Sequence, residues 1–166
     1  MIRVLSLVLA SGCLLTTTFG CSSGALLSDG APSAEALARE VLEAVRTADR
    51  GQLDRLAITE QEFRRLVWPR LPASRPERNL PFSFVWGDLR QKSQATLGGT
   101  IETYRGRLLE LVSVSFGETT DYVDYTVHRA ATFRVRDTAG RESEIRACGS
   151  FLEMDGIWKV FSYVVD

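Results

Sequence analysis

The chain has 166 residues, of which 45% are hydrophobic and 25% charged. These proportions describe an ordinary globular protein and exclude a disordered, collagen-like or disulfide-stapled chain. Twenty basic and twenty-one acidic residues leave a formal charge of −1, so no net basic field favours nucleic acid as a partner. The length allows one domain with a sizeable hydrophobic core.

Residues 1–20 have the pattern of a secretory signal. Arg3 precedes an apolar stretch over residues 4–10, and small residues stand directly before two of the cysteines. The apolar stretch is shorter than the roughly 20 residues that a membrane-spanning helix needs. We therefore expect residues 1–20 to be a signal peptide that is removed from the mature chain.

Two cysteines of this region, Cys13 and Cys21, each follow a glycine. A Gly-Cys pair after an apolar stretch resembles the lipobox of bacterial lipoproteins, in which the cysteine sulfur receives a diacylglycerol and the chain is cut just before it. Cys13 has the better local match, but choosing it leaves a very short apolar region. Cys21 leaves a sensible apolar length, although Thr18 and Phe19 depart from the box. We expect the lipid on Cys21, with Cys13 as one alternative and a plain secreted protein as another.

This resemblance implies a cell-envelope protein that a lipid anchor holds to a bacterial membrane, facing the periplasm or the exterior. The small and polar residues 21–32 predict a flexible tether between the anchor and the domain. With Cys21 lipidated, Cys148 is the free thiol of the mature chain, and its apolar strand pattern favours a buried structural role. One histidine and one spare cysteine do not make an ordinary zinc site, so no metal and no cofactor is expected.

The first half of the domain has helical periodicity. Ser33 is a predicted N-cap, and apolar residues recur at helical spacing after it. Thr59 and Glu62 form a capping box, and Pro69 ends the helix that follows. The predicted helices cover about 34–49, 60–67 and 83–104, with a short turn over 53–56 and a Pro- and Arg-rich loop over 69–81.

After Gly106 the pattern changes to alternation and predicts four strands, over about 107–116, 123–136, 142–154 and 157–165. Asp155-Gly156 is a strong two-residue hairpin signal. The loop over 138–140 must hold an odd number of residues to keep both apolar faces on one side, which favours a three-residue loop closed by Gly140.

These turns predict the register of the sheet. Glu153 should lie opposite Trp158, and Phe133 opposite Ile145. Regular alternation then places Val127 opposite Phe151 and Arg129 opposite Gly149. Arg129 is the one charged residue that this register puts on the apolar face of its strand.

Three helices followed by a four-stranded antiparallel meander resemble the nuclear transport factor 2-like group, and the closing Gly156-Ile157-Trp158-Lys159 looks like that group's last hairpin. The resemblance covers residues 33–166. It implies an α+β domain in which three N-terminal helices pack on a curved sheet and leave a cone-shaped cavity. The group includes ketosteroid-isomerase-like and polyketide-cyclase-like enzymes as well as non-catalytic binding domains, so the fold does not assign the function.

Two kinds of site follow from the predicted register. Arg129 is a candidate clamp for an anionic ligand, with Tyr125, Trp158 and Trp86 as further ligand-binding residues; the alternatives are an ion pair with a helix acid such as Asp88, or a bulge that turns Arg129 outward. A second hypothesis is a small isomerase- or dehydratase-like enzyme with Glu153 as base beside Tyr125. His128 is predicted to face away from the core.

The other face of the last two strands is too apolar to be left in water. A homodimer interface or a covering segment, for example the loop over 69–81, would bury it. Taken together, the sequence favours a lipid-anchored binding domain for a small anionic or apolar ligand or an envelope protein, and nothing in it predicts a nucleic-acid partner.

Overall fold

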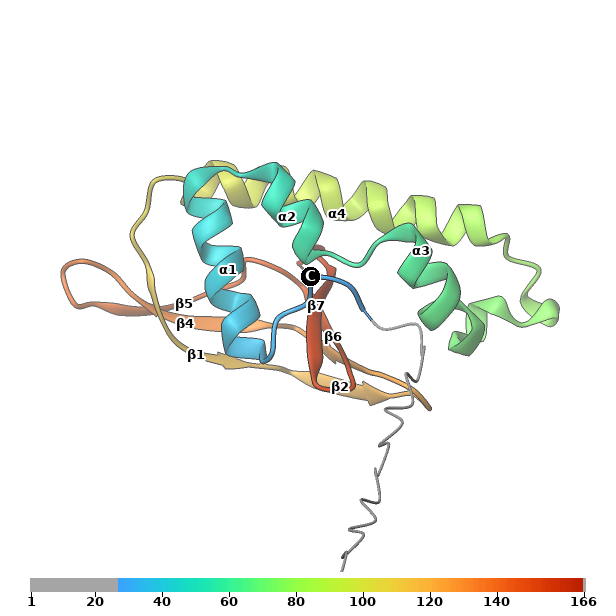
Figure 1. The fold of residues 1–166 in the computed structure, drawn as a ribbon. Coiled ribbons are helices and arrows are strands. Elements are labelled where there is room, and N and C mark those ends of the chain that lie inside the picture. Colours follow the sequence, from blue (N-terminus) through green and yellow to red (C-terminus); the bar gives the residue numbers. More distant parts are fainter. Residues whose placement is uncertain (1–26, 166) are drawn as a thin grey trace, which may run out of the picture.

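The computed structural model describes residues 27–165. Helices come first and antiparallel strands follow, which confirms the α+β class (Figure 1). The helices are α1 (Ala34–Thr47), α2 (Arg50–Leu56), α3 (Glu60–Glu62) and α4 (Phe82–Tyr104). Four short helical segments lie between α3 and α4, namely η1 (Phe63–Val67), η2 (Trp68–Arg70), η3 (Pro72–Ser74) and η4 (Pro76–Arg78). The strands are β1 (Glu110–Ser115), β2 (Glu118–Asp121), β3 (Thr126–Arg129), β4 (Thr132–Arg136), β5 (Glu142–Ile145), β6 (Ser150–Met154) and β7 (Ile157–Ser162). Within residues 27–165, no helix combines the length and hydropathy that crossing a membrane requires.

The helix starts follow the predicted local chemistry. The Ser33 hydroxyl accepts a hydrogen bond from the N–H of Ala36 at 3.1 Å and caps α1. The capping box of Thr59 and Glu62 starts α3 as predicted, with both of its hydrogen bonds present. Two predictions were too simple: α2 is a full helix where a short turn was expected, and most of the loop over 69–81 consists of short helical turns begun by prolines.

The four long predicted strands are not one meander. Two of them, over 123–136 and 142–154, are interrupted and become β3 with β4 and β5 with β6, while β2 lies between two predicted strands. The seven strands form a three-stranded sheet of order β1-β4-β5 and a four-stranded sheet of order β2-β3-β6-β7. Ala130 separates β3 from β4 and has a φ of 51°, which is left-handed backbone. A non-glycine residue in this region breaks regular alternation, so the side chains before it and after it face differently from the prediction.

The register confirms this change of face. Phe133 pairs with Ile145 and Glu153 pairs with Trp158, both as predicted. Val127, however, pairs with Leu152 rather than with Phe151, which lies opposite His128. A slip of one residue exchanges the two faces of a strand, so the prediction holds beside the turns and is wrong beyond the interruption.

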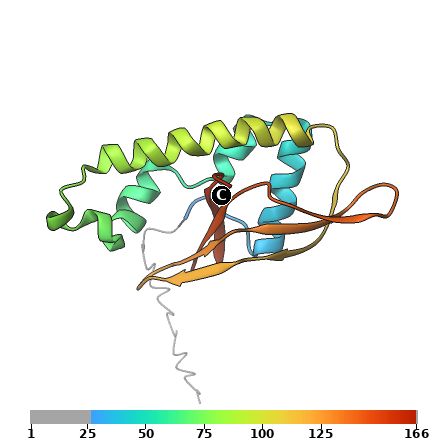
Figure 2. The ribbon, with the colours of Figure 1, turned by 180° about the vertical axis from the view of Figure 1, so that it is seen from behind.

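Two hydrophobic clusters lie on opposite faces of the last strands. The first joins α1, α2 and the C-terminal half of α4 to the three-stranded sheet and to Phe151 and Val160. The second joins η1 and the N-terminal half of α4 to Leu152, Met154 and Phe161. Both views show β6 and β7 between α1 and α3, with α4 running over both (Figures 1 and 2).

The second cluster buries the apolar face that the sequence leaves without a partner. Phe63 of η1 contacts Trp86 and Phe161, with ring centroids 5.2 and 6.1 Å apart. The cover is therefore a segment of this chain, and it begins before the Pro-rich stretch rather than in it. Regular alternation of the last two predicted strands places Cys148 and Tyr163 on this same face, but both lie in the first cluster instead.

The first described residues pack against the end of the chain. Ala31 exchanges two backbone hydrogen bonds with Trp158, of 2.9 and 2.8 Å. Leu27 is buried in the second cluster, and the Ser28 N–H donates to Glu62 Oε1 at 2.8 Å. The prediction of a flexible tether over 21–32 is therefore wrong for residues 27–31, which belong to the folded domain. Residues 1–26, with Cys13 and Cys21, lie outside the described part of the chain.

Candidate functional site

The structure places Arg129 at the surface. Its side chain is exposed, and its pairing partner is Ser150 on β6 rather than Gly149. Asp88, the helix acid considered as its partner, instead contacts Lys92 at 2.8 Å. The prediction of an inward-facing anion clamp is therefore wrong, because the left-handed residue Ala130 ends the alternation on which it depended.

Tyr125 lies on the opposite face of the sheet from Glu153. It is 3% exposed, stacks on Tyr122 at 4.6 Å and donates from its hydroxyl to the carbonyl oxygen of Val67 at 3.3 Å. Burial raises the pKa of this hydroxyl, and the neighbouring Tyr122 adds to the effect. Tyr125 is thus a structural residue of the second cluster, and the predicted pair of Glu153 with Tyr125 is not formed.

The remaining predicted ligand-binding residues are also separated. Trp86 belongs to the second cluster and lines a cavity of only about 10 Å³ beside Phe161. Trp158 packs against the first cluster, on the other face. Where a cone-shaped cavity was expected, Phe133, Phe151 and Val160 fill the interior and are 0% exposed. The four predicted residues therefore line no common site.

The prediction that His128 faces away from the core is wrong. It shares a face with Phe151 and Trp158, and its ring stacks on the Trp158 ring with centroids 4.6 Å apart. Phe116 contacts its ring at 4.9 Å. The side chain of His128 is 14% exposed, so it is partly buried among aromatic rings but still open to solvent at one edge.

Both ring nitrogens of His128 have partners. Nε2 lies 2.9 Å from Glu153 Oε2, and Nδ1 lies 3.3 Å from the hydroxyl oxygen of Thr119. Thr119 stands directly opposite His128 on β2, and Glu153 is its diagonal neighbour on β6. Glu153 is 35% exposed and is held in place by this contact. We call Phe116, Thr119, His128, Glu153 and Trp158 the His128 cluster.

The His128 cluster combines a hydrogen-bonded pair of polar side chains with aromatic rings. A neutral histidine donates to the carboxylate through Nε2 and accepts from Thr119 through Nδ1, while a protonated one forms an ion pair with Glu153. The rings of Phe116 and Trp158, which both contact the His128 ring, supply an apolar surface beside these polar atoms. A register shifted by one residue in β3 places His128 on this face. Nothing in the local sequence predicts that shift, because no neighbouring residue indicates that Ala130 is left-handed.

A second polar group is buried and structural. Lys159 is 1% exposed, and its Nζ lies 3.1 and 3.0 Å from the two oxygens of Glu62. Burial raises the pKa of Glu62, but hydrogen bonds from the N–H groups of Thr59 and Ser28 and the contact with Lys159 outweigh it, and the net pKa is lowered. This ion pair joins α3, β7 and the N-terminal segment, and it leaves no polar atom free for a ligand.

Other chemistry is limited in the described residues. Cys148 is fully buried, and burial raises the pKa of its thiol, so it is not a reactive nucleophile. Within residues 27–165, no group of three or more histidine, cysteine, aspartate or glutamate side chains is arranged to hold a metal ion.

Two larger surface cavities lie away from the His128 cluster. One of about 810 Å³ runs along α1 and α2 and is lined by Arg39, Glu43 and Gln52 among others. One of about 490 Å³ lies between η1, η2 and the two turns at the ends of β2 and β6, with Arg65, Asp124 and Asp155 in its wall. None of the four predicted ligand-binding residues lines either cavity.

Comparison with known proteins adds no assignment: no protein-family model matches the chain, and neither a curated protein nor a solved structure matches it.

Proposed function

We propose that this protein is a lipid-anchored lipoprotein of the bacterial cell envelope, whose nuclear transport factor 2-like domain binds its ligand on the sheet surface at the His128 cluster. The order of helices followed by antiparallel strands and the Asp155-Gly156 hairpin support the family. The N-terminal sequence pattern supports the anchor at Cys21. Because large side chains fill the interior, we place the ligand on the surface of the sheet and not in a cone-shaped cavity.

One observation carries the location of the binding surface. Nε2 of His128 and Oε2 of Glu153 lie 2.9 Å apart in a partly exposed pair, and the His128 ring contacts the rings of Phe116 and Trp158. The exposed edges of aromatic rings gain free energy when a ligand covers them, and this pair places hydrogen-bonding atoms beside those rings. A small ligand with one apolar face and a carboxylate or hydrogen-bonding group fits this arrangement.

The anchor is tested by mass spectrometry of the mature protein. Cys21 is expected to carry the lipid, and Cys21→Ser is expected to release the protein from membranes, because a diacyl group with a further chain is needed for stable anchoring. Cys13→Ser is the matched control and leaves the anchor intact. A lipid on Cys13, or no lipid on either cysteine, contradicts the anchor proposal.

The binding surface is tested with a panel of small aromatic and aliphatic carboxylates in thermal melts. A ligand that binds raises the melting temperature in proportion to ln(1 + [L]/Kd). Glu153→Gln and Trp158→Ala should abolish that rise, while Arg129→Gln should retain it because Arg129 lies elsewhere on the surface. A ligand whose effect depends on Arg129 and not on Glu153 would overturn this location.

A second candidate function is an isomerase- or dehydratase-like enzyme, which the contact between His128 and Glu153 favours. A carboxylate that shares a proton with histidine can move a proton between two atoms of a substrate. If small carbonyl compounds are turned over, Glu153→Gln and His128→Gln should each lower the rate by about 10²–10⁴-fold. Tyr125→Phe should leave it unchanged, because Tyr125 is on the other face.

A further inference from the structure

Basic and aromatic residues are concentrated in one part of the chain. Residues 63–87 contain five arginines against one glutamate, although the whole protein carries a charge of −1. The same stretch contains five aromatic residues and four prolines. It forms the end of the molecule that includes η1–η4 and the start of α4 (Figure 1). We call residues 63–87 the basic end.

Part of the basic end carries charges that no described residue pairs with and apolar side chains that no described residue covers. Arg75 and Arg78 are exposed and make no ion pair, and Arg65 is likewise exposed and unpaired. Phe84 is 63% exposed and Leu80 is 41% exposed. The acidic residues of this region do not cancel the charge fully: Glu77 is the one acid within the basic end, Asp124 is held by Arg70 at 2.7 Å, and Asp155 lies in the wall of the 490 Å³ cavity that Arg65 also lines.

The basic end lies beside the first described residues. Ser28 is hydrogen-bonded to Glu62, which directly precedes the basic end. The Phe63 ring lies 6.0 Å from the Phe82 ring, and the guanidinium of Arg64 lies 3.7 Å from the centre of the Phe82 ring. Through η1, these contacts connect the start of α4 to the segment where the described chain begins.

The length of chain before the domain limits how far the basic end can lie from the anchor. Leu27 is already buried in the fold. Six residue steps separate it from Cys21, and a fully extended chain covers at most about 3.6 Å per step, or roughly 22 Å. A lipid on Cys21 therefore holds this side of the domain within a short distance of the membrane surface.

We propose that the basic end is a membrane-contacting surface that binds anionic phospholipid headgroups through Arg65, Arg75 and Arg78 and rests Leu80 and Phe84 at the bilayer interface. Arginine and aromatic side chains together suit this environment, because the guanidinium meets phosphate oxygens while the rings lie among the headgroups. The distance argument rests on the proposed anchor at Cys21, whereas the charge and exposure of the basic end do not.

The test uses the full chain with Cys21→Ser, so that no lipid contributes. Binding is measured by co-sedimentation with vesicles of phosphatidylcholine alone and of phosphatidylcholine with 30% phosphatidylglycerol. Each basic residue near an anionic surface contributes about fivefold in affinity, so replacing Arg65, Arg75 and Arg78 together by Gln should weaken binding to the anionic vesicles roughly 100-fold. Binding should also fall steeply in 0.5 M salt. Neutral vesicles measure what the N-terminal segment contributes by itself.

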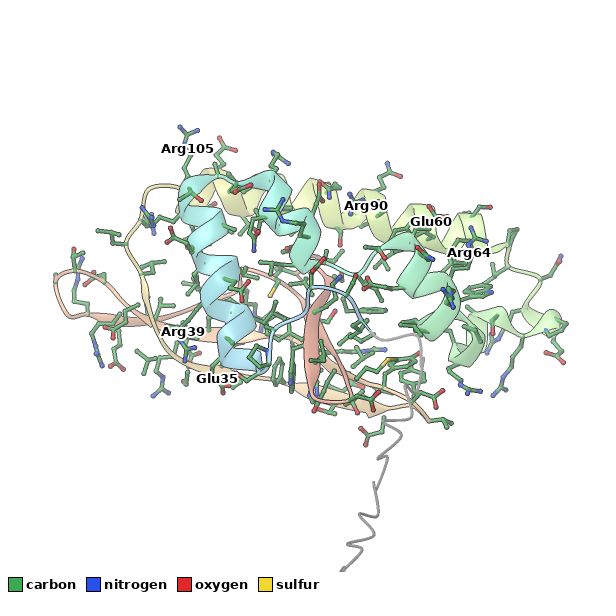
Figure 3. The ribbon with its side chains drawn as sticks, viewed as in Figure 1. Glu35, Arg39, Glu60, Arg64, Arg90 and Arg105 are labelled. Carbon is green, nitrogen blue, oxygen red and sulfur yellow. The ribbon has the colours of Figure 1, made fainter. Side chains whose placement is uncertain are left out.

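Matched variants at the other end of the molecule serve as controls. Arg39, Arg50 and Arg105 are also exposed and form no ion pair with another residue of 27–165, and Figure 3 shows Arg39 and Arg105 far from Arg64. Their replacement by Gln changes the net charge equally and should leave vesicle binding within about twofold of the parent. For the apolar part, Leu80→Ser with Phe84→Ser should weaken binding to anionic vesicles, whereas Leu108→Ser with Val112→Ser, which are 60% and 40% exposed, should not.

Equal loss in the two arginine variants, or no preference for anionic vesicles in the parent, would overturn the proposal. The result is separable from the anchor experiment. If Cys21 carries a lipid and the vesicles are not bound, the anchor stands and the membrane-contacting surface is wrong. If Cys21 carries none and the anionic vesicles are bound through Arg65, Arg75 and Arg78, the surface stands without the anchor.

Discussion

At the scale of single residues, the pair of Glu62 and Lys159 shows how a few side chains hold distant segments together. Glu62 accepts from Lys159 and from the N–H groups of Ser28 and Thr59. A buried ion pair is not a source of stability by itself, but removing one partner leaves an uncompensated charge in the interior. The main energetic effect of the pair is therefore the loss of stability when one of its two partners is removed.

Glu62→Gln should lower the free energy of unfolding by about 3–5 kcal/mol, measured by urea denaturation. The folded state lowers the pKa of Glu62, so its stabilising contribution is present above the unfolded-state pKa and is lost as the pH falls through the folded-state value. The difference between parent and variant should therefore shrink on acidification below about pH 4. Glu60→Gln, on the same turn but in an exposed pair with Arg64, should change stability by less than about 1 kcal/mol. Equal effects of the two variants would contradict this account.

Gly149 is required because the chain end approaches it closely. A β-carbon at this position would overlap the backbone carbonyl of Val164, and a backbone atom cannot move aside as the tip of a side chain can. Gly149→Ala should cost more than about 3 kcal/mol, since overpacking forces the backbone to shift. Gly87→Ala is the matched control: it lies in α4 with no atom near the added methyl group and should gain up to about 1 kcal/mol. Thermal melting compares the two, and a stable Gly149→Ala protein would show that the C-terminal residues are held less tightly than described.

At the scale of elements, η1 is needed because the last strands are apolar on both faces. Phe151 and Val160 face the first cluster, and Leu152 and Phe161 face the second. A two-faced apolar strand needs cover on each side. α1 supplies the cover on one side, and η1 together with the start of α4 supplies it on the other.

Phe63→Ala should therefore destabilise the protein by about 3–5 kcal/mol, because Phe63 is 1% exposed and fills the contact between η1, α4 and β7. Phe84→Ala removes the same atoms from a side chain that is 63% exposed and should change stability by less than about 0.5 kcal/mol. Urea denaturation of both variants measures the difference. A loss below about 1 kcal/mol in Phe63→Ala would mean that the second cluster contributes little to folding.

At the scale of the whole molecule, residues 27–31 of the N-terminal segment belong to the folded domain. Ala31 pairs with Trp158, and Leu27 is buried, so the domain begins at the edge of β7 beside the basic end. On the proposal that Cys21 carries the lipid, the distance to the membrane is set by a few residues. The two proposals then support each other: the anchor brings the basic end to the bilayer, and the basic end limits rotation of the domain.

Lengthening the chain before Leu27 tests this arrangement in membranes. Insertion of 20 Gly/Ser residues after Gly24 should leave anchoring unchanged but lower the local concentration of the basic end at the surface, since effective concentration falls with linker length. A cysteine placed by Leu80→Cys should then react several-fold faster with a membrane-impermeant maleimide. The same insertion combined with Leu108→Cys serves as control and should not change the rate. Equal rates at Leu80→Cys with both chain lengths would contradict the short-tether argument.

The sequence by itself determined the local features of this protein. The caps at Ser33 and Thr59, the long helix α4 and the turn at Asp155-Gly156 depend on neighbouring residues, and each is present as predicted. The pairing of Glu153 with Trp158 also follows, because a two-residue turn sets the register beside it.

Only the tertiary structure decided the candidate site. The prediction for Arg129 and Tyr125 depended on unbroken alternation across Ala130, which has a left-handed backbone. The residues on either side of it, Arg129 and Ala131, are held by backbone hydrogen bonds to Gly117 and Gly149, which belong to other segments of the chain. One such residue exchanged the faces of β3, moving Arg129 to solvent and His128 beside Trp158 and Glu153. Alternation carries a prediction along a strand only as far as the strand is regular, and a bend imposed by packing on both faces is not encoded in the residues at the bend.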